Sequence, residues 1–491
     1  MKLFMVLLIV QCNGTILGIE NILLGNLVGV QSFCRVMGSW DESTSAYAVA
    51  AGTLSLWAGV YSIAQIIGNL SAGWVADRFG RSKALFTFIV IIYLGVMTEI
   101  LSKNKNDFTG AKIIMGIGNG MNQVATTTFV AEATPREIRG ITIGLYWLTS
   151  AIGNLFCTLV IYGCNQAWGS NAFDDRAWKV PLYIGLSTPT ITLILMLLLM
   201  PESPSWLILK DRVEDAKKSL HKLYPRRSVD EINRMTHELQ YTVYKERELR
   251  DAAKSASWLD CFKGVNRLRT FCAIFPSLST QFAGTQLINT YSTYFFEIAH
   301  LDNSLEASVI VYVVGIVASI IAFALMDMPK IGRWPLLFYG LIIMTVMMLA
   351  IAIVDSVGNP ASAGSGNAFV VFLAIFYACS VIGPGVAGWA YAGETGSATL
   401  RAKTATLSMC SNALVGGVFN IVIPYELDAI GPKSGYMFFG LGAIALVFVY
   451  LWVPEVTGRT YAQLNELFER RVPPRQFKTT ECTGDYGNGE A

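Results

Sequence analysis

Long apolar runs separated by short polar turns extend over most of this chain. A helix needs about 20 mostly apolar residues to cross the hydrocarbon core of a bilayer, and each run is close to that length. We therefore predict an all-α membrane protein. The pattern contains twelve candidate spans, with approximate limits 3–32, 53–75, 84–102, 108–131, 140–163, 178–200, 266–296, 306–327, 334–356, 367–392, 402–427 and 435–453.

The connections between the runs differ in charge. Lys and Arg gather in alternate connections, above all in the segment 201–270, and are scarce in the others. Basic residues favour the cytosolic side of a membrane, so both termini and this long segment are predicted to be cytosolic. The first run continues past Gln11, Asn13 and Glu20 without a small-residue cleavage site, which favours a spanning helix over a signal peptide.

The segment after the sixth span is the only sizeable polar piece. Residues 213–220 and 229–239 combine apolar positions at helical spacing with mixed charge, which predicts short amphipathic helices under the membrane part. A disordered linker is the alternative. The predicted organisation is an N-terminal half, a cytosolic helical linker, a C-terminal half and a cytosolic tail, over 1–200, 201–265, 266–453 and 454–491.

Three sequence marks occur twice, in the same order and at nearly the same separation. Gly80-Arg81 after span two recurs as Gly332-Arg333 after span eight. Glu132 and Arg139 after span four recur, with the same spacing, as Glu394 and Arg401 after span ten, and Pro201-Glu202 recurs as Pro454-Glu455. Three ordered repeats indicate two homologous six-helix halves. Parallel repeats of this kind are typical of transporters, with the substrate site between the halves near the membrane midplane.

Composition excludes several other classes. The chain is 53% hydrophobic and 15% charged, whereas soluble proteins are about 25% charged. A net charge of +2 suggests no nucleic-acid partner. Nine scattered cysteines without a C-x-x-C pair and three dispersed histidines indicate no metal site, and we expect no cofactor. No phosphate-binding loop or nucleophile–base set supports an enzyme.

Two ionisable residues fall inside predicted spans. Glu20 lies within span one and Lys112 lies early in span four, whereas the other runs look nearly free of charge. Intramembrane charges are costly and mark functional sites by default. Burial opposes the charge of a carboxylate and a nearby cation favours it, so Glu20 could titrate during a transport cycle. A permanent Glu20–Lys112 ion pair that only fixes helix packing is an equal alternative, and Lys112 could also extend to the interface.

A second group of charges lies at the cytosolic ends of the spans. Opposite charges there could tie the two halves together when the inside is shut and separate when it opens, which would make a two-state gate. Individually solvated surface charges are the alternative. The predicted gate residues are Asp77, Arg78, Arg81, Glu132, Arg139, Glu202, Arg333, Glu394, Arg401 and Glu455.

Polar groups and helix breakers recur within spans seven, ten and eleven. Span seven carries Gln281, Asn289 and Tyr291, span ten carries Gly383-Pro384-Gly385 before Trp389, and span eleven carries Asn420. Interrupted helices form cavities, amides suit sugar hydroxyls, and aromatic rings suit the apolar face of a pyranose. Spacing alone supports only a polar, uncharged solute as the substrate, and the amides could instead simply join the helices to one another.

These marks belong to a set of ordered motifs. The set comprises Gly18-Ile-Glu20, the Asp77–Arg81 loop, Lys112 with Gly116-x-Gly118-x-Gly120, Glu132-x-x-Pro135-x-x-x-Arg139-Gly140, Pro201-Glu-Ser-Pro204, Gln281-x-x-Gly284 and Pro454-Glu-Val-Thr-Gly458-Arg459. With this set the chain resembles the sugar porter family of the major facilitator superfamily over nearly its whole length. Within the family, residues 291–297, 400–404 and 458–469 are similar to fungal α-glucoside (maltose-type) permeases.

The resemblance implies the major facilitator fold and alternating-access uptake of a hexose or an α-glucoside such as maltose, coupled to protons. It implies Gln281 and Trp389 as sugar-site positions. The chain departs from the family at Trp147, where a glutamine is usual, and at Leu17 and Gln65, where maltose-type permeases carry acids. A proton-independent facilitator and a sugar sensor that does not transport are therefore alternatives. We expect a plasma-membrane monomer whose partners are a sugar, a proton and the lipid bilayer.

Overall fold

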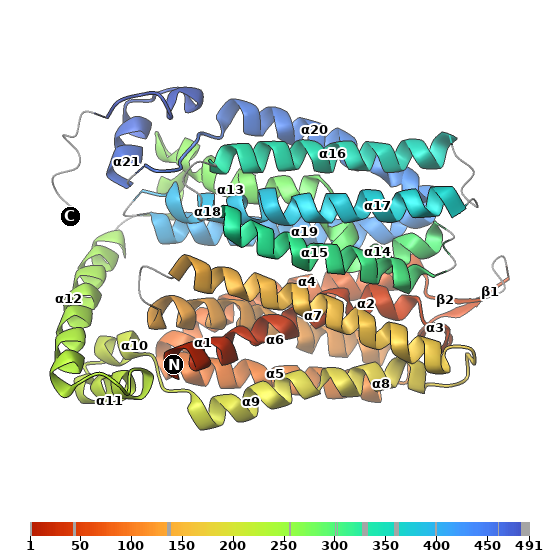
Figure 1. The fold of residues 1–491 in the computed structure, drawn as a ribbon, viewed down its shortest axis with the longest axis horizontal. Coiled ribbons are helices and arrows are strands. Elements are labelled where there is room, and N and C mark those ends of the chain that lie inside the picture. The colour runs from red at the N-terminus through yellow and green to blue at the C-terminus, as the bar shows by residue number, and fades with distance from the viewer. Residues whose placement is uncertain are drawn as a thin grey trace.

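The computed structural model of the chain is a bundle of long, roughly parallel helices in two halves (Figure 1). It describes residues 2–42, 46–134, 139–254, 257–299, 301, 303–326, 332–357, 363–397, 400–459 and 461–482. Both termini and the linker helices lie at one end of the bundle, which we call the linker end. The opposite end, which we call the hairpin end, carries the antiparallel strands β1 (Ser39–Asp41) and β2 (Ala46–Ala48).

The N-terminal half contains six spans, two of which are split into two helices. Span one is a single apolar segment in which α1 and α2 meet at Cys12, and it ends at Val28, four residues before the predicted limit of 32. The short helix α3 (Gln31–Met37) follows it. The helices of this half are α1 (Lys2–Gln11), α2 (Asn13–Val28), α4 (Ala51–Phe79), α5 (Arg81–Leu101), α6 (Lys105–Ala133), α7 (Arg139–Trp168), α8 (Arg176–Gly185) and α9 (Ser187–Leu199).

The C-terminal half repeats this arrangement, and its first and fourth spans are interrupted. Its helices are α13 (Asn266–Phe282), α14 (Thr285–Ile298), α15 (Ser304–Met326), α16 (Arg333–Val357), α17 (Ala363–Ser380), α18 (Val386–Glu394), α19 (Arg401–Ile430) and α20 (Gly435–Trp452). A π-helical turn over Val381–Gly385, which contains Pro384, joins α17 to α18. Gly284 separates α13 from α14 with a φ of +97°, a conformation that glycine adopts without a Cβ penalty.

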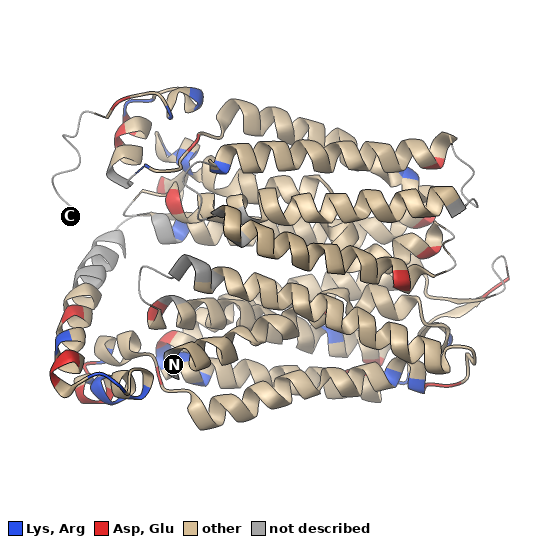
Figure 2. Cartoon of the chain, viewed as in Figure 1, with Lys and Arg blue, Asp and Glu red and all other residues tan. Residues whose placement is uncertain are grey.

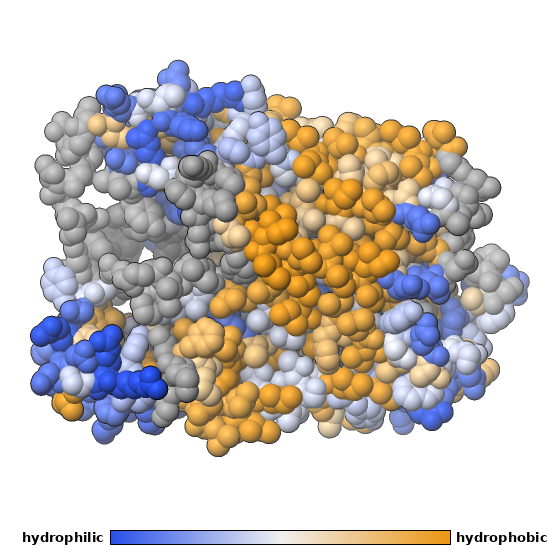
Figure 3. Space-filling model, viewed as in Figure 1, coloured by the Kyte–Doolittle hydropathy of each residue, from blue (hydrophilic) through white to orange (hydrophobic). Residues whose placement is uncertain are grey.

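Twelve spans account for these helices. Within the described residues, eight segments are long and apolar enough to cross a membrane by length and composition. One of them, Lys403–Trp452, holds both α19 and α20. The remaining spans, α4, α6 and the broken pair α13–α14, carry more polar residues. Figure 3 shows an apolar band across the middle of the bundle with hydrophilic residues at both ends, as a bilayer requires.

The segment between the halves is helical. It forms α10 (Pro204–Leu209), α11 (Val213–Leu223) and α12 (Val229–Lys254) at the linker end, so the two predicted amphipathic helices are present and longer than expected. After the last span, α21 (Tyr461–Glu469) returns to the same end. Short 3₁₀ turns at Trp258–Phe262, Gly431–Ser434 and Pro474–Gln476 complete the described structure.

The two halves meet closely toward the hairpin end. A Cβ added at Gly25 of α2 would lie 2.0 Å from the carbonyl oxygen of Thr290 on α14, so only glycine allows this approach. Asn26 bonds both Thr158 of its own half and Thr293 of the other. Helices α4 and α19 also pack along each other, as do α7 and α15. These three helix pairs form much of the interface between the halves.

Candidate functional site

A cluster of three ionisable side chains lies inside the N-terminal half. Lys112 Nζ of α6 is 2.6 Å from Glu20 Oε1 of α2 and 2.9 Å from Glu99 Oε1 of α5. The side chains are 3%, 2% and 0% exposed, respectively, so Lys112 does not extend to the interface. The ion pair that the sequence left open is thus present. It does not stand alone, because a second carboxylate shares the lysine.

Glu99 is the functional candidate that sequence reasoning missed. The expectation that the other spans are nearly free of charge was wrong here. Glu99 lies two residues before the end of α5, where a glutamate usually reaches water. In the fold, its carboxylate instead points inward between helices. The signal available in the sequence was its position near the same membrane end as Lys112.

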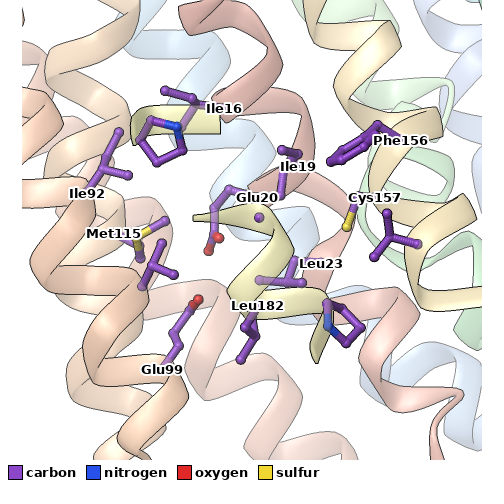
Figure 4. A pocket seen from close by; sticks show the side chains of 15 residues that line it. Ile16, Ile19, Glu20, Leu23, Ile92, Glu99, Met115, Phe156, Cys157 and Leu182 are labelled. Carbon is purple, nitrogen blue, oxygen red and sulfur yellow. The ribbon is translucent and has the colours of Figure 1, made fainter. Parts of the chain in front are cut away.

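A cavity lies beside this cluster. Its lining combines the two carboxylates with apolar side chains from α2, α5, α6, α7, α8 and α9, among them Ile92, Met115 and Leu182. Figure 4 shows the carboxylates of Glu20 and Glu99 directed toward each other within it. The cavity volume is about 30 Å³. A single water needs roughly 10–15 Å³ on this measure, so one or two waters fit.

The polar residues of span seven face span eleven near the middle of the C-terminal half. Gln281 is 6% exposed and donates a hydrogen bond to Asn412 Oδ1 at 3.1 Å. Asn412 in turn donates to the carbonyl of Ser277. Gly416 leaves room for Gln281 and Gln286, since both amides approach the position of its missing Cβ. These amides therefore lie close together at the break between α13 and α14.

A second polar group joins the two halves. The Tyr291 hydroxyl donates to the carbonyl of Asn420 at 2.7 Å, and its side chain is fully buried. Asn420 Nδ2 donates to Ser62 Oγ of α4 at 3.4 Å. Asn289, two residues before Tyr291 on α14, is half-buried.

Two tryptophans stack across the interface between the halves. Trp147 of α7 and Trp389 of α18 have ring centroids 6.0 Å apart and ring planes within 23° of parallel. Trp147 is nevertheless 42% exposed. The sequence indicated Trp389 as a sugar-site position and Trp147 as a departure from the family. Only the fold shows that these two residues are partners.

The gate residues of the N-terminal half form one network at the linker end. Arg81 is 7% exposed and bonds both carboxylate oxygens of Glu132, together with Asp77 Oδ1 and the Ala76 carbonyl. Glu202 accepts hydrogen bonds from the backbone amide of Ser82, at the start of α5, where the helix dipole favours a negative charge. The network ties α4, α5 and α6 to the chain that enters the linker.

The C-terminal half repeats this network. Arg333 forms an ion pair with Glu394, as Arg81 does with Glu132. Glu455 accepts from the backbone amides of Arg333 and Trp334 at the start of α16, as Glu202 does at α5. The doubled sequence marks thus correspond to doubled contacts.

Each of these described ion pairs joins two residues of the same half, and none joins one half to the other. The proposed tie between the halves therefore stays a prediction. The guanidinium of Arg78 lies over the rings of Trp74 and Phe79. Arg139 and Arg401 begin α7 and α19, but their side chains lie outside the described residues.

Two six-helix halves, polar and aromatic groups at the interface between them, and a buried charge cluster define a membrane transport protein. Comparison with protein families identifies which family of transport proteins this is. The chain belongs to the family described as "Sugar (and other) transporter", whose model matches residues 6–468.

Curated relatives agree with this family. The chain is 28% identical over 494 residues to the general alpha-glucoside permease of Saccharomyces cerevisiae, which covers 96% of this chain and 76% of the relative. It is 26% identical to the yeast hexose transporter HXT17, and 27% identical to the low-affinity glucose transporter of Kluyveromyces lactis. Each of these two matches covers 95% of this chain and 82% of the relative.

Solved structures share the fold. The inward-open conformation of the xylose transporter XylE from E. coli matches with a TM-score of 0.76 at 20% identity, covering 95% of this chain and 99% of that one. The proton:xylose symporter XylE bound to 6-bromo-6-deoxy-D-glucose matches with a TM-score of 0.72, at the same identity and coverage. The twelve-helix major facilitator fold predicted from the sequence is therefore confirmed.

Proposed function

We propose that the protein carries a hexose or an α-glucoside such as maltose across the plasma membrane by alternating access, in symport with a proton. The observation that carries this proposal is the set of neutral polar and aromatic side chains at the interface between the halves. Gln281, Asn289, Tyr291 and Asn420 offer amide and hydroxyl groups, and Trp389 offers a flat apolar face. Such groups suit the hydroxyls and the ring of a sugar. The names of the curated relatives support the same substrate class.

Alternating access follows from where the halves touch. The close approach of α2 to α14 lies toward the hairpin end. The described charge networks at the linker end stay within each half. The molecule is thus held closed at the hairpin end. Placing the basic linker in the cytosol puts both termini inside and makes this a state whose outer side is shut.

Proton coupling is assigned to the buried cluster that contains Glu20 and Lys112. These two residues lie on α2 and α6 of the N-terminal half, whereas the proposed sugar-site residues lie on helices of the C-terminal half. A charge that changes during transport can therefore act on helix positions without contacting the substrate. One chain supplies both halves, so a monomer suffices, and the proposed activity is transport without chemical change of the sugar.

The test is uptake of labelled glucose and maltose by transporter-deficient yeast that expresses this chain. Uptake is measured at acidic and neutral external pH, with and without a protonophore, for the wild type and for Glu20→Gln. Concentrative uptake that collapses with the protonophore supports proton symport. Uptake that only equilibrates supports a facilitator, and binding of sugar without uptake would contradict transport and favour a sensor.

A further inference from the structure

The stacked tryptophans connect the two halves where the helices that carry them do not pack along each other. Trp147 of α7 and Trp389 of α18 have ring centroids 6.0 Å apart, and their ring planes lie within 23° of parallel. Within the described residues, α7 packs along α15 across the interface, but not along α18. Charged residues gather at the two ends of the bundle and are sparse between them (Figure 2). The contact between α7 and α18 is therefore made mainly by two neutral aromatic side chains.

The stack lies close to the amides that we assign to the sugar. A Cβ added at Gly388 would lie 3.2 Å from the Cα of Ser277, so α18 meets α13 next to Trp389. Gln281 follows Ser277 on α13 by about one helical turn, which rises roughly 5.4 Å along the axis. A sugar that bonds the Gln281 amide therefore lies within reach of the Trp389 ring.

Stacking covers one particular face of Trp389. Trp147 belongs to the N-terminal half, so the face that it covers is the one that Trp389 turns toward that half. A sugar held between the halves meets the same face. An aromatic ring receives a pyranose through its flat apolar surface. The Trp147 indole and a sugar ring therefore need the same surface and cannot occupy it together.

Trp147 is the partner that can move away. Its side chain is 42% exposed, and rotamer changes of exposed side chains are fast. Trp389 is half-buried, and the helix that carries it is fixed to its own half. The Tyr391 hydroxyl, on the same helix, donates a hydrogen bond to the Pro454 carbonyl at 2.7 Å. Separation of the two rings thus requires a new rotamer of Trp147 rather than a shift of α18.

We propose that Trp147 occupies the sugar-binding face of Trp389 in this state, and that a sugar binds there only when the two indoles separate. This inference rests on the proposed function, which assigns Trp389 to the sugar. Trp147 is thus a competitor that belongs to the chain itself. It lowers the affinity for every sugar that uses this face, because only the unstacked fraction of the protein can bind.

The size of the effect follows from the stacking contact. A stacked aromatic pair corresponds to roughly a 2- to 12-fold change in an equilibrium constant. Trp147→Ala removes the competitor and leaves the Trp389 face open. The dissociation constant of the sugar should therefore fall by roughly 2- to 12-fold. Loss of Trp389 has the opposite sign, because it removes the surface that the sugar uses.

The first test measures binding of labelled glucose and of labelled maltose to the purified full chain in nanodiscs. It compares the wild type with Trp147→Ala and Trp334→Ala. Trp334 is the matched control, because it stacks on Phe338 within the C-terminal half, with ring centroids 4.7 Å apart and planes within 14° of parallel. Trp147→Ala is expected to bind more tightly, and Trp334→Ala to bind like the wild type. An unchanged or weaker affinity of a correctly folded Trp147→Ala overturns the inference.

The second test combines the two substitutions at the stack. Trp389→Ala alone is expected to weaken sugar binding. Addition of Trp147→Ala to Trp389→Ala is expected to change the dissociation constant no further, because the surface for which Trp147 competes is gone. An equal gain in affinity in both backgrounds would show that Trp147 acts elsewhere, and it overturns the inference.

The third test observes the ring itself. The protein is labelled with fluorotryptophan, and the fluorine resonance of position 147 is assigned by its loss in Trp147→Phe. Saturating glucose is expected to shift this resonance, whereas the resonance of Trp334, assigned in the same way, is expected to stay in place. Glucose binding without a shift at position 147 overturns the inference alone. A wild type and a Trp147→Ala that bind neither sugar contradict the proposed function.

Discussion

A single methyl group at the contact between α2 and α14 should shift the balance between the two transport states. In the present structure, a Cβ at position 25 would lie 2.0 Å from the Thr290 carbonyl oxygen, whereas ordinary contacts begin at 3.4 Å. Gly25→Ala therefore forces the two helices about 1.4 Å apart at that point. The helix itself is not weakened, because alanine is the better helix former. The substitution therefore destabilises the state in which the hairpin end is closed.

The magnitude follows from overpacking. Inserting a methyl group into a close-packed contact costs about 1–3 kcal/mol. A state in which the hairpin end is open does not bear this cost, because α2 and α14 have separated there. A bias of about 1–3 kcal/mol corresponds to a shift of roughly 5- to 150-fold in the ratio of the two states. Sugar uptake should fall as well, because the cycle needs the closed hairpin end.

Pulsed electron paramagnetic resonance can measure this shift. Spin labels at Ser170 and Asn303 report the separation of the halves at the hairpin end, since both are exposed and follow α7 and α14, respectively. Gly25→Ala should move the distance distribution to longer values. Gly163→Ala is the control, because nothing lies within 4 Å of a Cβ built there. Identical distributions and uptake for both variants would refute the reasoning.

Three further outcomes follow from contacts elsewhere. Arg81→Ala leaves the partly buried Glu132 without its main partner, so the melting temperature in detergent should drop. A double-mutant cycle with Glu132→Ala should give a coupling energy of about 1–3 kcal/mol. Additive effects of the two substitutions would contradict the pairing. Trp147→Gln removes a ring-stacking contact worth about 0.5–1.5 kcal/mol and widens the interface between the halves. The ratio of maltose uptake to glucose uptake should therefore rise. An unchanged ratio would show that Trp147 does not affect sugar selection. Gly284→Ala combines a positive φ with a Cβ 2.9 Å from the Phe438 ring, whereas Gly264→Ala has the positive φ alone. Gly284→Ala should therefore lower the melting temperature clearly more than Gly264→Ala. Equal effects would show that the contact with Phe438 adds nothing to the cost.

The spans were predictable because a single physical requirement determines them. A bilayer demands runs of a fixed length, so the third span expected over 84–102 appears as Arg81–Leu101. The breaks within spans were less accessible. Gly284 and Pro384 are recognisable helix breakers, whereas the boundary between α1 and α2 at Cys12 keeps helical backbone angles. Apolar content alone does not distinguish one straight helix from two.

The sequence alone indicates some residues of the candidate site, but it does not indicate which of them contact one another. Glu20 and Lys112 stood out because charges within apolar runs are rare. Glu99 did not, because a glutamate near the end of a run looks like an interfacial residue until the fold shows it 0% exposed. The doubled motifs likewise indicated that Arg81 and Glu132 matter. They could not indicate that each arginine pairs within its own half.

The distribution of strong and weak contacts indicates how the molecule moves. Within each half, the ends of several helices are joined by charged networks such as Arg81 with Glu132, and a charged hydrogen-bonded pair of this kind contributes about 1–3 kcal/mol. Among the described residues, the hydrogen bonds between the halves join neutral groups, for example Asn154 to Tyr377 and Asn420 to Ser62. Each of these contributes only about 0.5–1.5 kcal/mol. We therefore expect the interface between the halves to separate before the networks within each half do, so that each half moves as a unit.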